Sequence, residues 1–378
     1  MRDDESLAWL TLARAPGLDR ERLSAALALL GSARAVVGAA AADAGRAGIP
    51  ADTRAYLKSA AAYPTAAEEH WLEEERHHLV PFTDPHFPRL LHQLPDCPLA
   101  LYLSGNVDAL HDPQLAVVGS RNPTAQGRDI AFDFAEYFAE RGLGITSGLA
   151  AGIDTCAHRG ALKGQGITLA ILGTGIDVIY PRANAALHHE IRQNGALVSE
   201  FPLGTPPRRA NFPQRNRIIA GLSLGTLVVE AARRSGSLIT ARLANAHGRD
   251  VFAIPGSIHN PLSRGCHELI KAGAKLVETA DDILRELNFS AFFSNELRAR
   301  SGGGEPPASA PGMDKEHKIL LDALGFDPVD LDSLVVRTGF KPEAVSSMVL
   351  ILELEGHVQA APGGRYSRVA YRRAGGER

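Results

Sequence analysis

The chain has 378 residues, of which 45% are hydrophobic and 22% are charged, values typical of globular proteins and unlike those of disordered chains. This length predicts two or three domains. The formal net charge of -3 excludes a general attraction for polyanions, so any binding of nucleic acid requires locally clustered basic residues.

The cysteines and the N-terminus predict a cytoplasmic location. Cys97, Cys156 and Cys266 stand far apart in no metal-ligand spacing and form no disulfide framework. The chain begins with an acidic Met1-Arg-Asp-Asp-Glu segment, and no apolar run approaches the roughly 18 residues that span a bilayer. We expect no membrane insertion, no metal and no cofactor.

Residues 1–72 are predicted to form a small helical domain. Leucines recur at helical spacing, as at Leu23, Leu27 and Leu30, and Pro16-Gly17 separates two such segments. The turn is compatible with a helix-hairpin-helix that binds DNA phosphate. Because acidic residues balance the basic ones, a packing or partner-docking module is the favoured interpretation.

Residues 73–295 are predicted to form a Rossmann-like α/β domain. Short apolar runs alternate with helical stretches, a pattern typical of buried parallel strands joined by crossover helices. We expect a doubly wound, mostly parallel sheet with its sites at the carboxyl ends of the strands. The predicted strands are Leu115–Val118, Gly144–Thr146, Thr168–Leu172, Ala196–Ser199, Thr226–Val229 and Asp250–Ile254.

Residues 296–312 are rich in glycine, serine and proline and are predicted to be a flexible linker. Residues 313–378 then follow the order helix, short helix, longer helix and hairpin, which indicates a winged helix. Residues 311–378 hold nine basic and ten acidic residues, and the predicted recognition helix, Pro342–Glu355, contains no basic residue. A role in protein contact or weak DNA binding is therefore favoured, and binding of duplex DNA stays open.

Three glycine-rich turns are predicted to lie at one edge of the sheet. They contain Gly119-Ser120-Arg121, the segment from Gly148 to Gly152, and Gly173-Thr174-Gly175. The first differs from the Gly-x-Gly-x-x-Gly signature, so a dinucleotide site is poorly supported, whereas phosphate binding remains reasonable. Each turn taken alone is equally compatible with tight backbone packing.

The segment Thr205–Arg217 contains four arginines, one phenylalanine and no acid. Arginine matches phosphate oxygens, and Phe212 offers a face on which an unpaired base can stack, which together favour single-stranded DNA as the ligand. Four phosphate contacts predict a log-log salt slope of about -3, which requires dimerisation or cooperativity for useful affinity. Alternatively, Arg215 and Arg217 form structural ion pairs while Phe212 lies in the core.

Common catalytic signatures are absent from the sequence. The chain lacks a Gly-x-Ser-x-Gly elbow, a Walker loop and a His-Glu-x-x-His motif. Asp154 and His158 could bind a metal, but a polar helix face is favoured. Gly225-Thr226 and Glu230 resemble parts of nucleotide phosphoribohydrolases, which makes a nucleotide-processing enzyme the alternative, although the Pro-Gly-Gly that precedes Gly-Thr there is absent.

Four long motifs in order carry a family resemblance. They are Val117–Arg121, Ser147–Asp154, Phe212–Gly221 and Ser235–Thr240. From about residue 86 to residue 287 the chain resembles the DprA/Smf family of bacterial DNA-processing proteins. The resemblance implies a homodimer that binds single-stranded DNA regardless of sequence, protects it, and loads the RecA recombinase in natural transformation, with a repair role left open.

The resemblance also implies the residues of the site. Arg121, Arg209 and Phe212 match the DNA-contacting pocket of the family, whereas Ala151 stands where members often carry a basic residue. The predicted DNA-binding residues are Gly119, Ser120, Arg121, Gly148, Gly152, Arg208, Arg209, Phe212, Arg215, Asn216, Arg217 and Ser237. The predicted dimer interface contains His267, Ile270 and Leu276, and no catalytic residue is expected.

Overall fold

The computed structural model describes residues 4–289, 315–325, 329–354, 357–361 and 365–368. Two compact units divide the chain, Met1–Phe292 and Phe293–Arg378. The predicted linker, residues 296–312, lies outside the described residues.

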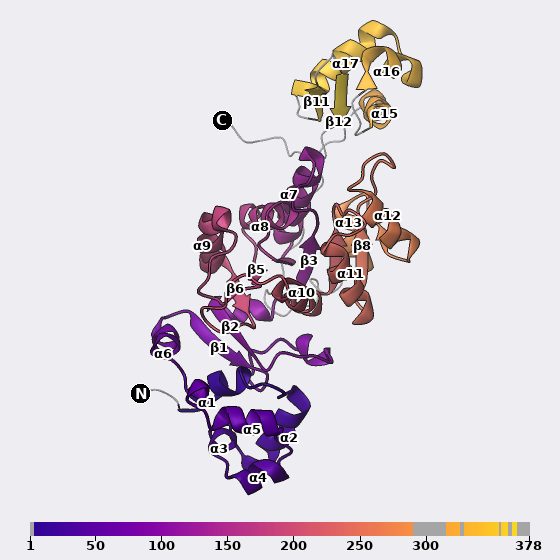
Figure 1. Cartoon of the computed structure of the whole chain (residues 1–378). Coiled ribbons are helices and arrows are strands. Elements are labelled where there is room, and N and C mark those ends of the chain that lie inside the picture. The colour runs from indigo at the N-terminus through magenta and orange to yellow at the C-terminus, as the bar shows by residue number, and fades with distance from the viewer. Residues whose placement is uncertain (1–3, 290–314, 326–328, 355–356, 362–364, 369–378) are drawn as a thin grey trace, which may run out of the picture. The chain divides into compact units, whose positions relative to one another are not determined.

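A nine-stranded sheet forms the centre of the first unit (Figure 1). Its order is β1-β2-β6-β5-β4-β3-β7-β8-β9. The pairs from β6-β5 to β8-β9 are all parallel, whereas β1-β2 and β2-β6 are antiparallel. The strands are β1 (His77–Pro81), β2 (Ala100–Gly105), β3 (Gln114–Val118), β4 (Gly144–Ser147), β5 (Thr168–Ile171), β6 (Ala196–Ser199), β7 (Gly225–Val228), β8 (Asp250–Ala253) and β9 (Lys275–Leu276).

The Rossmann-like architecture is confirmed, with all six predicted parallel strands within one or two residues of their expected ends. Sequence reasoning missed the antiparallel strands β1 and β2 and the short edge strand β9. The six central strands are apolar on both faces, which is why their runs are continuous in sequence.

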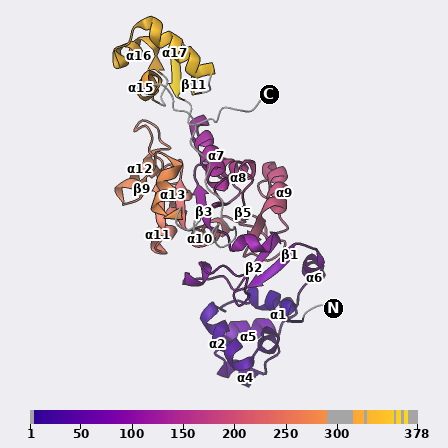
Figure 2. The ribbon, with the colours of Figure 1, turned by 180° about the vertical axis from the view of Figure 1, so that it is seen from behind.

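Helices cover both faces of the sheet, as the front and rear views show (Figures 1 and 2). The chain moves outward from β3 to β6, then returns to β7 on the other side of β3. Right-handed crossovers consequently place the helices before and after this reversal on opposite faces. One face carries α7 (Ala125–Ala139), α8 (Ile153–Lys163) and α9 (Ala185–Asn194); the other carries α10 (Asn211–Leu222) and α11 (Ser237–Ala246). The unit ends with α12 (Arg264–Lys271) and α13 (Ala280–Glu286).

The N-terminal helices pack into the same unit as the sheet. Trp9, Leu23 and Val36 share one hydrophobic core with Val80 and Leu101. The predicted boundary at residue 72 thus falls inside one compact unit, and a division into separate domains there stays a prediction. The helices are α1 (Asp4–Ala13), α2 (Arg20–Leu30), α3 (Ala33–Val37), α4 (Ala41–Arg46), α5 (Ala51–Leu57) and α6 (Ala66–Glu73).

An ion pair joins Arg14, which follows the end of α1, to Glu68 of α6. Arg14 Nη1 donates to Glu68 Oε1 at 3.0 Å and to Oε2 at 2.9 Å, and the Glu68 side chain is only 4% exposed. Glu68 also accepts from the backbone N–H of Thr65, completing a capping box at the start of α6. A carboxylate buried in this way is stabilised by charge-assisted hydrogen bonds.

The second unit is a winged helix, as predicted. Its helices are α15 (Lys315–Leu324), α16 (Leu331–Thr338) and α17 (Pro342–Leu354), and β10 (Val329–Asp330), β12 (Arg365–Arg368) and β11 (Val358–Ala361) form a sheet in the order β10-β12-β11. Leu320, Leu334, Val345 and Leu352 lie in its core. Among the described residues of the whole chain, no helix is long and apolar enough to cross a membrane.

Replacing Glu68 with alanine should lower the free energy of unfolding of the first unit by about 3 kcal/mol, because the largely buried Arg14 guanidinium loses its carboxylate partner. Denaturant titration followed by the fluorescence of Trp9 and Trp71, which lie on α1 and α6, measures the loss. Arg22→Ala is the control, since both side chains of the Arg22–Asp19 pair are more than half exposed, and it should cost less than about 1 kcal/mol. Equal losses in the two variants would contradict the assignment.

Candidate nucleic-acid interface

The predicted turns meet at the carboxyl ends of the parallel strands, next to the reversal between β3 and β7. Gly119, Ser120 and Arg121 follow β3, and the turn from Gly148 to Gly152 follows β4. The segment after β6 leads into α10, and the segment after β7 leads into α11. Open α/β sheets bind ligands at this position because the loops diverge at the reversal.

Gly152 allows the turn after β4 to pack closely against the turn after β3. Its φ is +85°, and a Cβ there would lie 2.3 Å from the carbonyl oxygen of Ser120. The next residue, Ile153, donates its backbone N–H to the same oxygen at 3.1 Å. These contacts require glycine and hold the turn that carries Arg121, whose side chain is exposed.

Arg121 and Phe212 form the exposed centre of the site. The Arg121 guanidinium carbon lies 5.7 Å from the centroid of the Phe212 ring, within the range of a cation–π contact. Phe212 is half-buried on the first turn of α10, so it is neither a core residue nor a free side chain. This pairing brings together two predicted residues that are separated by 91 positions in sequence.

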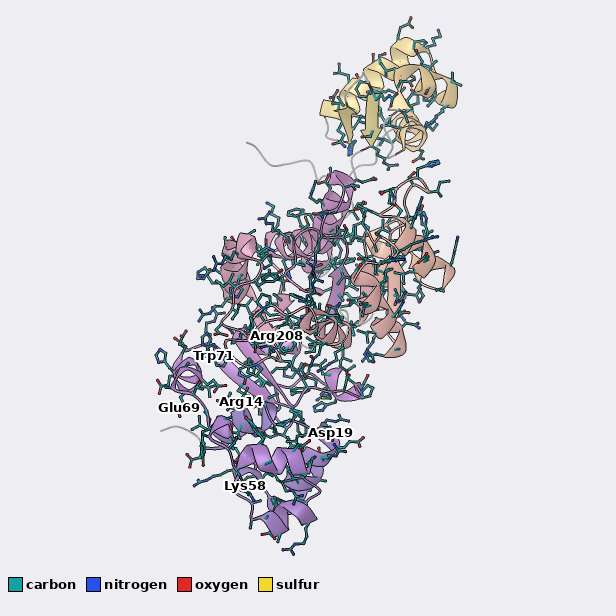
Figure 3. The ribbon with its side chains drawn as sticks, in the orientation of Figure 1. Arg14, Asp19, Lys58, Glu69, Trp71 and Arg208 are labelled. Atoms are coloured by element: carbon teal, nitrogen blue, oxygen red, sulfur yellow. The ribbon has the colours of Figure 1, made fainter. Side chains whose placement is uncertain are left out.

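The arginine-rich segment is a loop only up to Ala210, because α10 begins at Asn211. Pro213 is tolerated in the first turn of that helix, where a backbone N–H has no helical partner. Arg208, labelled in Figure 3, and Arg209 are exposed on the loop. Arg215 and Arg217 belong to the helix and are buried, at 4% and 6% exposure.

Arg215 is buried and is bonded inside the fold, and its contact with DNA stays a prediction. Its Nη1 donates to the carbonyl oxygen of Gly148 at 2.7 Å and also to that of Ile171, while Nε donates to Asn216 Oδ1. A Cβ at Gly148 would lie 2.5 Å from the same guanidinium. Burial lowers the pKa of Arg215 to about 10, so it stays charged at neutral pH.

Arg217 is likewise structural, as the alternative interpretation proposed. Its guanidinium pairs with Glu200, and its Nε lies 3.2 Å from Asp96 Oδ2. Burial raises the pKa of Glu200 and the Arg217 charge opposes that rise. The segment contains no acid, but these two partners from outside it neutralise Arg217, so two exposed arginines remain on the loop.

The remaining predicted residues line the start of α11. Ser237 is buried, and its hydroxyl lies 2.6 Å from that of Ser235. Asn216 is half-buried and its Nδ2 donates to the carbonyl oxygen of Gly236 at 3.4 Å. The Asn216 bond therefore connects α10 to the residue that precedes α11.

Both carboxylate oxygens of Glu230 accept hydrogen bonds from Thr124 at the start of α7. Its Oε2 accepts from the backbone N–H of Thr124 at 2.9 Å, and its Oε1 accepts from the Thr124 hydroxyl at 2.6 Å. Thr124 in turn caps α7 by accepting from the N–H of Gly127. Glu230 thus fixes the helix that follows the Arg121 turn.

Asp154 and His158 are buried, so the predicted polar helix face is wrong. Asp154 accepts from the backbone N–H groups of Gly148 and Ala150; burial raises its pKa and the Arg215 charge opposes that rise. Among the described residues, no group of three or more histidine, cysteine or acidic side chains could hold a metal. A metal site at this pair is therefore unsupported.

His158 is a buried neutral imidazole. The Thr168 hydroxyl donates to the carbonyl oxygen of Ile145 at 2.8 Å, so His158 Nδ1, 2.7 Å from that hydroxyl, must donate to it. Nε2 is buried without a hydrogen-bond partner. Burial therefore lowers the pKa of His158 to about 3, because a proton on Nε2 would have no acceptor.

The predicted dimer residues lie beyond β8, two strands away from β3. His267 and Ile270 are on α12, and Leu276 is on the edge strand β9. His267 Nε2 lies 2.9 Å from the carbonyl oxygen of Gly256, and Ile270 packs partly against the core. Leu276 is 49% exposed, whereas His267 and Ile270 are half-buried, so Leu276 is the most accessible of the three residues.

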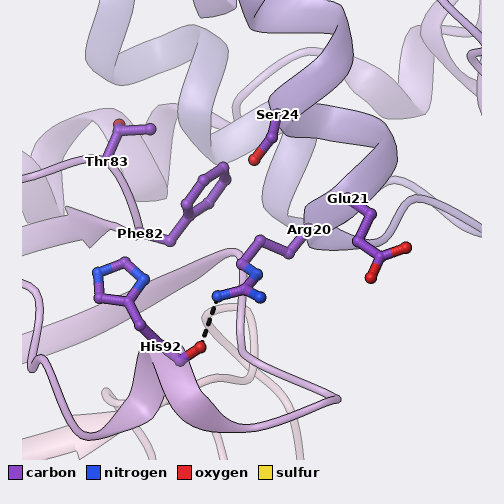
Figure 4. A pocket seen from close by; sticks show the side chains of 6 residues that line it. All are labelled: Arg20, Glu21, Ser24, Phe82, Thr83 and His92. Carbon is purple, nitrogen blue, oxygen red and sulfur yellow. Dashed lines mark hydrogen bonds between the residues drawn. The ribbon is translucent and has the colours of Figure 1, made fainter.

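Neither described cavity coincides with this interface. The first, of about 490 Å³, lies between α2 and the segment after β1, where Arg20 Nη1 donates to the carbonyl oxygen of His92 at 2.6 Å (Figure 4). The second, of about 250 Å³, lies between the α1–α2 turn and the Asp96–Ala100 segment.

Sequence reasoning missed Tyr180, which contacts Phe212 from the loop after β5. The two ring centroids are 5.7 Å apart with planes inclined at 45°. The signal was present as an apolar pair, Ile179-Tyr180, in a segment otherwise typical of a turn.

Comparison with known proteins agrees with this geometry. A family model described as DNA recombination-mediator protein A matches residues 78–288, and one described as the DprA winged helix domain matches residues 304–364. Protein Smf of Escherichia coli is 46% identical over 297 residues, which cover 78% of each chain. DNA processing protein DprA of Streptococcus pneumoniae is 49% identical over 206 residues, covering 54% of this chain and 73% of that protein.

Two solved structures are similar as well. The X-ray structure of Streptococcus pneumoniae DprA matches with a TM-score of 0.64 at 38% identity, covering 75% of this chain and 98% of that chain. A Helicobacter pylori DprA structure, described as giving insight into a unique single-stranded DNA binding mode, matches with a TM-score of 0.51 at 30% identity. It covers 54% of this chain and 94% of that one.

The buried His158 should make stability fall in acid. Its pKa is about 3 in the folded state against 6.5 ordinarily, so the unfolded state binds the extra proton between these values. Protonation of His158 in the unfolded state leaves the free energy of unfolding unchanged above pH 6.5 and lowers it as the pH falls from 6.5 toward 3. The loss at pH 5 is about 2 kcal/mol. Denaturant titrations at pH 7 and pH 5 measure it.

His158→Asn is the test variant, since its amide can donate to Thr168 and carries no titrating proton; it should flatten this part of the pH dependence. His70→Asn is the control because the His70 side chain is 78% exposed, and it should leave the pH dependence as in the wild type. An unchanged slope in His158→Asn would contradict the buried neutral state.

Proposed function

The chain belongs to the DprA/Smf family of DNA-processing proteins, and on that premise we propose that it binds single-stranded DNA regardless of sequence at the interface around Arg121 and Phe212. The observation that carries the proposal is the exposed Arg121 guanidinium against the Phe212 ring at the carboxyl edge of the sheet. A cation for phosphate beside a ring for a base is the combination that binds single strands without reading sequence.

The charges near the ring support a polyanionic ligand. Arg121, Arg208 and Arg209 are exposed, and Arg215 and Arg217 carry internal partners. Three phosphate contacts give a log-log salt slope of about -2 per subunit on single strands, smaller than the slope of about -3 expected from four. Such a subunit binds weakly on its own, which supports a dimer or cooperative assembly as the active form.

We further propose that the protein protects such DNA and loads RecA onto it. The recombination-mediator description of the matched family model supports this step. The bond network of Glu230 with Thr124 supports a binding protein over the phosphoribohydrolase alternative, because both carboxylate oxygens already hold the start of α7.

Arg121→Ala and Arg209→Ala should each weaken binding of a single-stranded oligonucleotide by about tenfold, because each removes one charge-assisted contact to phosphate. Each should also reduce the log-log salt slope by about 0.7. Electrophoretic shifts over a salt series measure both quantities. Stimulation of RecA assembly on the same DNA should fall in parallel.

Arg22→Ala is the matched control, since it removes an exposed arginine from α2 and should bind like the wild type. Wild-type affinity in both Arg121→Ala and Arg209→Ala would overturn the proposed interface. Unaltered thermal unfolding of the variants confirms that any loss concerns binding.

We propose that the homodimer forms through α12 and β9. Leu276→Glu should give a monomer with unaltered stability, since this side chain is 49% exposed, whereas a charge at Ile270 would also disturb the core. Light scattering measures the mass, and DNA affinity should fall at least tenfold because avidity is lost. A Leu276→Glu monomer that binds as tightly as the wild type would refute the dependence on dimerisation.

A further inference from the structure

We propose that Tyr180 is the second aromatic wall of the DNA interface and that Tyr180 and Phe212 together hold an unpaired nucleobase. This inference rests on the proposed function and adds a residue and a ligand group to the site. The Tyr180 ring is 40% exposed and its centroid lies 5.7 Å from that of Phe212.

The two rings are inclined at 45° and so form an open angle rather than a closed stack. Arg121 lies against the same Phe212 ring, so a phosphate at Arg121 places the attached nucleotide within reach of both aromatic faces. Aromatic faces accept any base, which agrees with binding that ignores sequence. The neighbouring Ile179, 42% exposed, extends the apolar surface of this loop.

The loop that carries Tyr180 is held against the loop that carries the arginines. Gly175 donates its backbone N–H to the carbonyl oxygen of Thr205 at 2.9 Å. Gly204 donates its N–H to Asp177 Oδ1 at 2.8 Å and Oδ2 at 3.0 Å. Asn211 Nδ2 donates to the carbonyl oxygen of Gly173 at 3.0 Å, beside Phe212 itself.

The backbone beneath the Phe212 ring and the loop that carries Tyr180 are also fixed in position. A Cβ at Gly173 would lie 2.9 Å from Phe212 Cδ1, so the ring lies directly on the backbone at the end of β5. Within the loop, the Thr174 hydroxyl donates to the carbonyl oxygen of Val178 at 3.0 Å. The two rings are therefore positioned before a ligand arrives, which lowers the entropy lost on binding.

The test compares an ordinary single-stranded oligonucleotide with one of equal length whose sugars lack bases. Wild-type protein should prefer the ordinary strand, because only it can stack. Tyr180→Ala should bind the ordinary strand about 5- to 100-fold more weakly while binding the abasic strand as the wild type does. Tyr180→Phe should restore the preference, since the ring supplies the stacking surface.

A structural role for Tyr180 would weaken both strands equally, and that result would overturn the inference, as would a Tyr180→Ala protein with wild-type preference. Tyr63→Ala is the control, because Tyr63 is 71% exposed on the N-terminal helical segment. Arg121→Ala separates the two proposals, since it should weaken both strands. Wild-type protein that binds neither strand would refute the proposed function along with the inference.

Discussion

The buried guanidinium of Arg215 is the interaction on which the interface depends. It donates to the carbonyl oxygens at the ends of β4 and β5, and so attaches α10 to the edge of the sheet. Phe212 lies one helical turn before Arg215, with the guanidinium carbon 5.8 Å from the ring centroid. The half-buried Phe212 ring therefore lies next to a buried charge. The desolvation of that charge is offset by two carbonyl acceptors and by the nearby Asp154.

The sequence predicted the fold well because burial of the central strands leaves a pattern that needs no tertiary knowledge. It missed β1 and β2, which pair antiparallel at the side of the sheet where the N-terminal helices pack. β1 begins with two histidines, and only its last two residues are buried, whereas β2 is buried throughout. Both strands depend on antiparallel pairing and on a core that Val80 and Leu101 share with the distant N-terminal helices.

The sequence predicted where the glycine-rich turns lie, but it did not predict which arginines are exposed and which are buried. Exposed Arg209 and buried Arg215 are chemically identical, and which of them faces solvent depends on where α10 begins. Once the helix starts at Asn211, its period places Arg215 on the same side as Ile218, Ile219 and Leu222, which face the core. The partners that hold the two buried arginines, Gly148 for Arg215 and Glu200 for Arg217, lie outside the segment Thr205–Arg217. The sequence of that segment therefore does not show that these arginines are buried.

The distribution of charge explains how an acidic chain can present a polyanion site. Two arginines of the site, Arg215 and Arg217, are buried and stabilise the edge of the sheet. The others, Arg121, Arg208 and Arg209, are exposed, so a ligand would contact only these three. An exposed loop that kept all four charges would repel itself and require ordering on binding. Neutralising two of them inside the fold gives up phosphate contacts and gains rigidity. In the proposed dimer, the second subunit would supply the affinity that one rigid surface lacks.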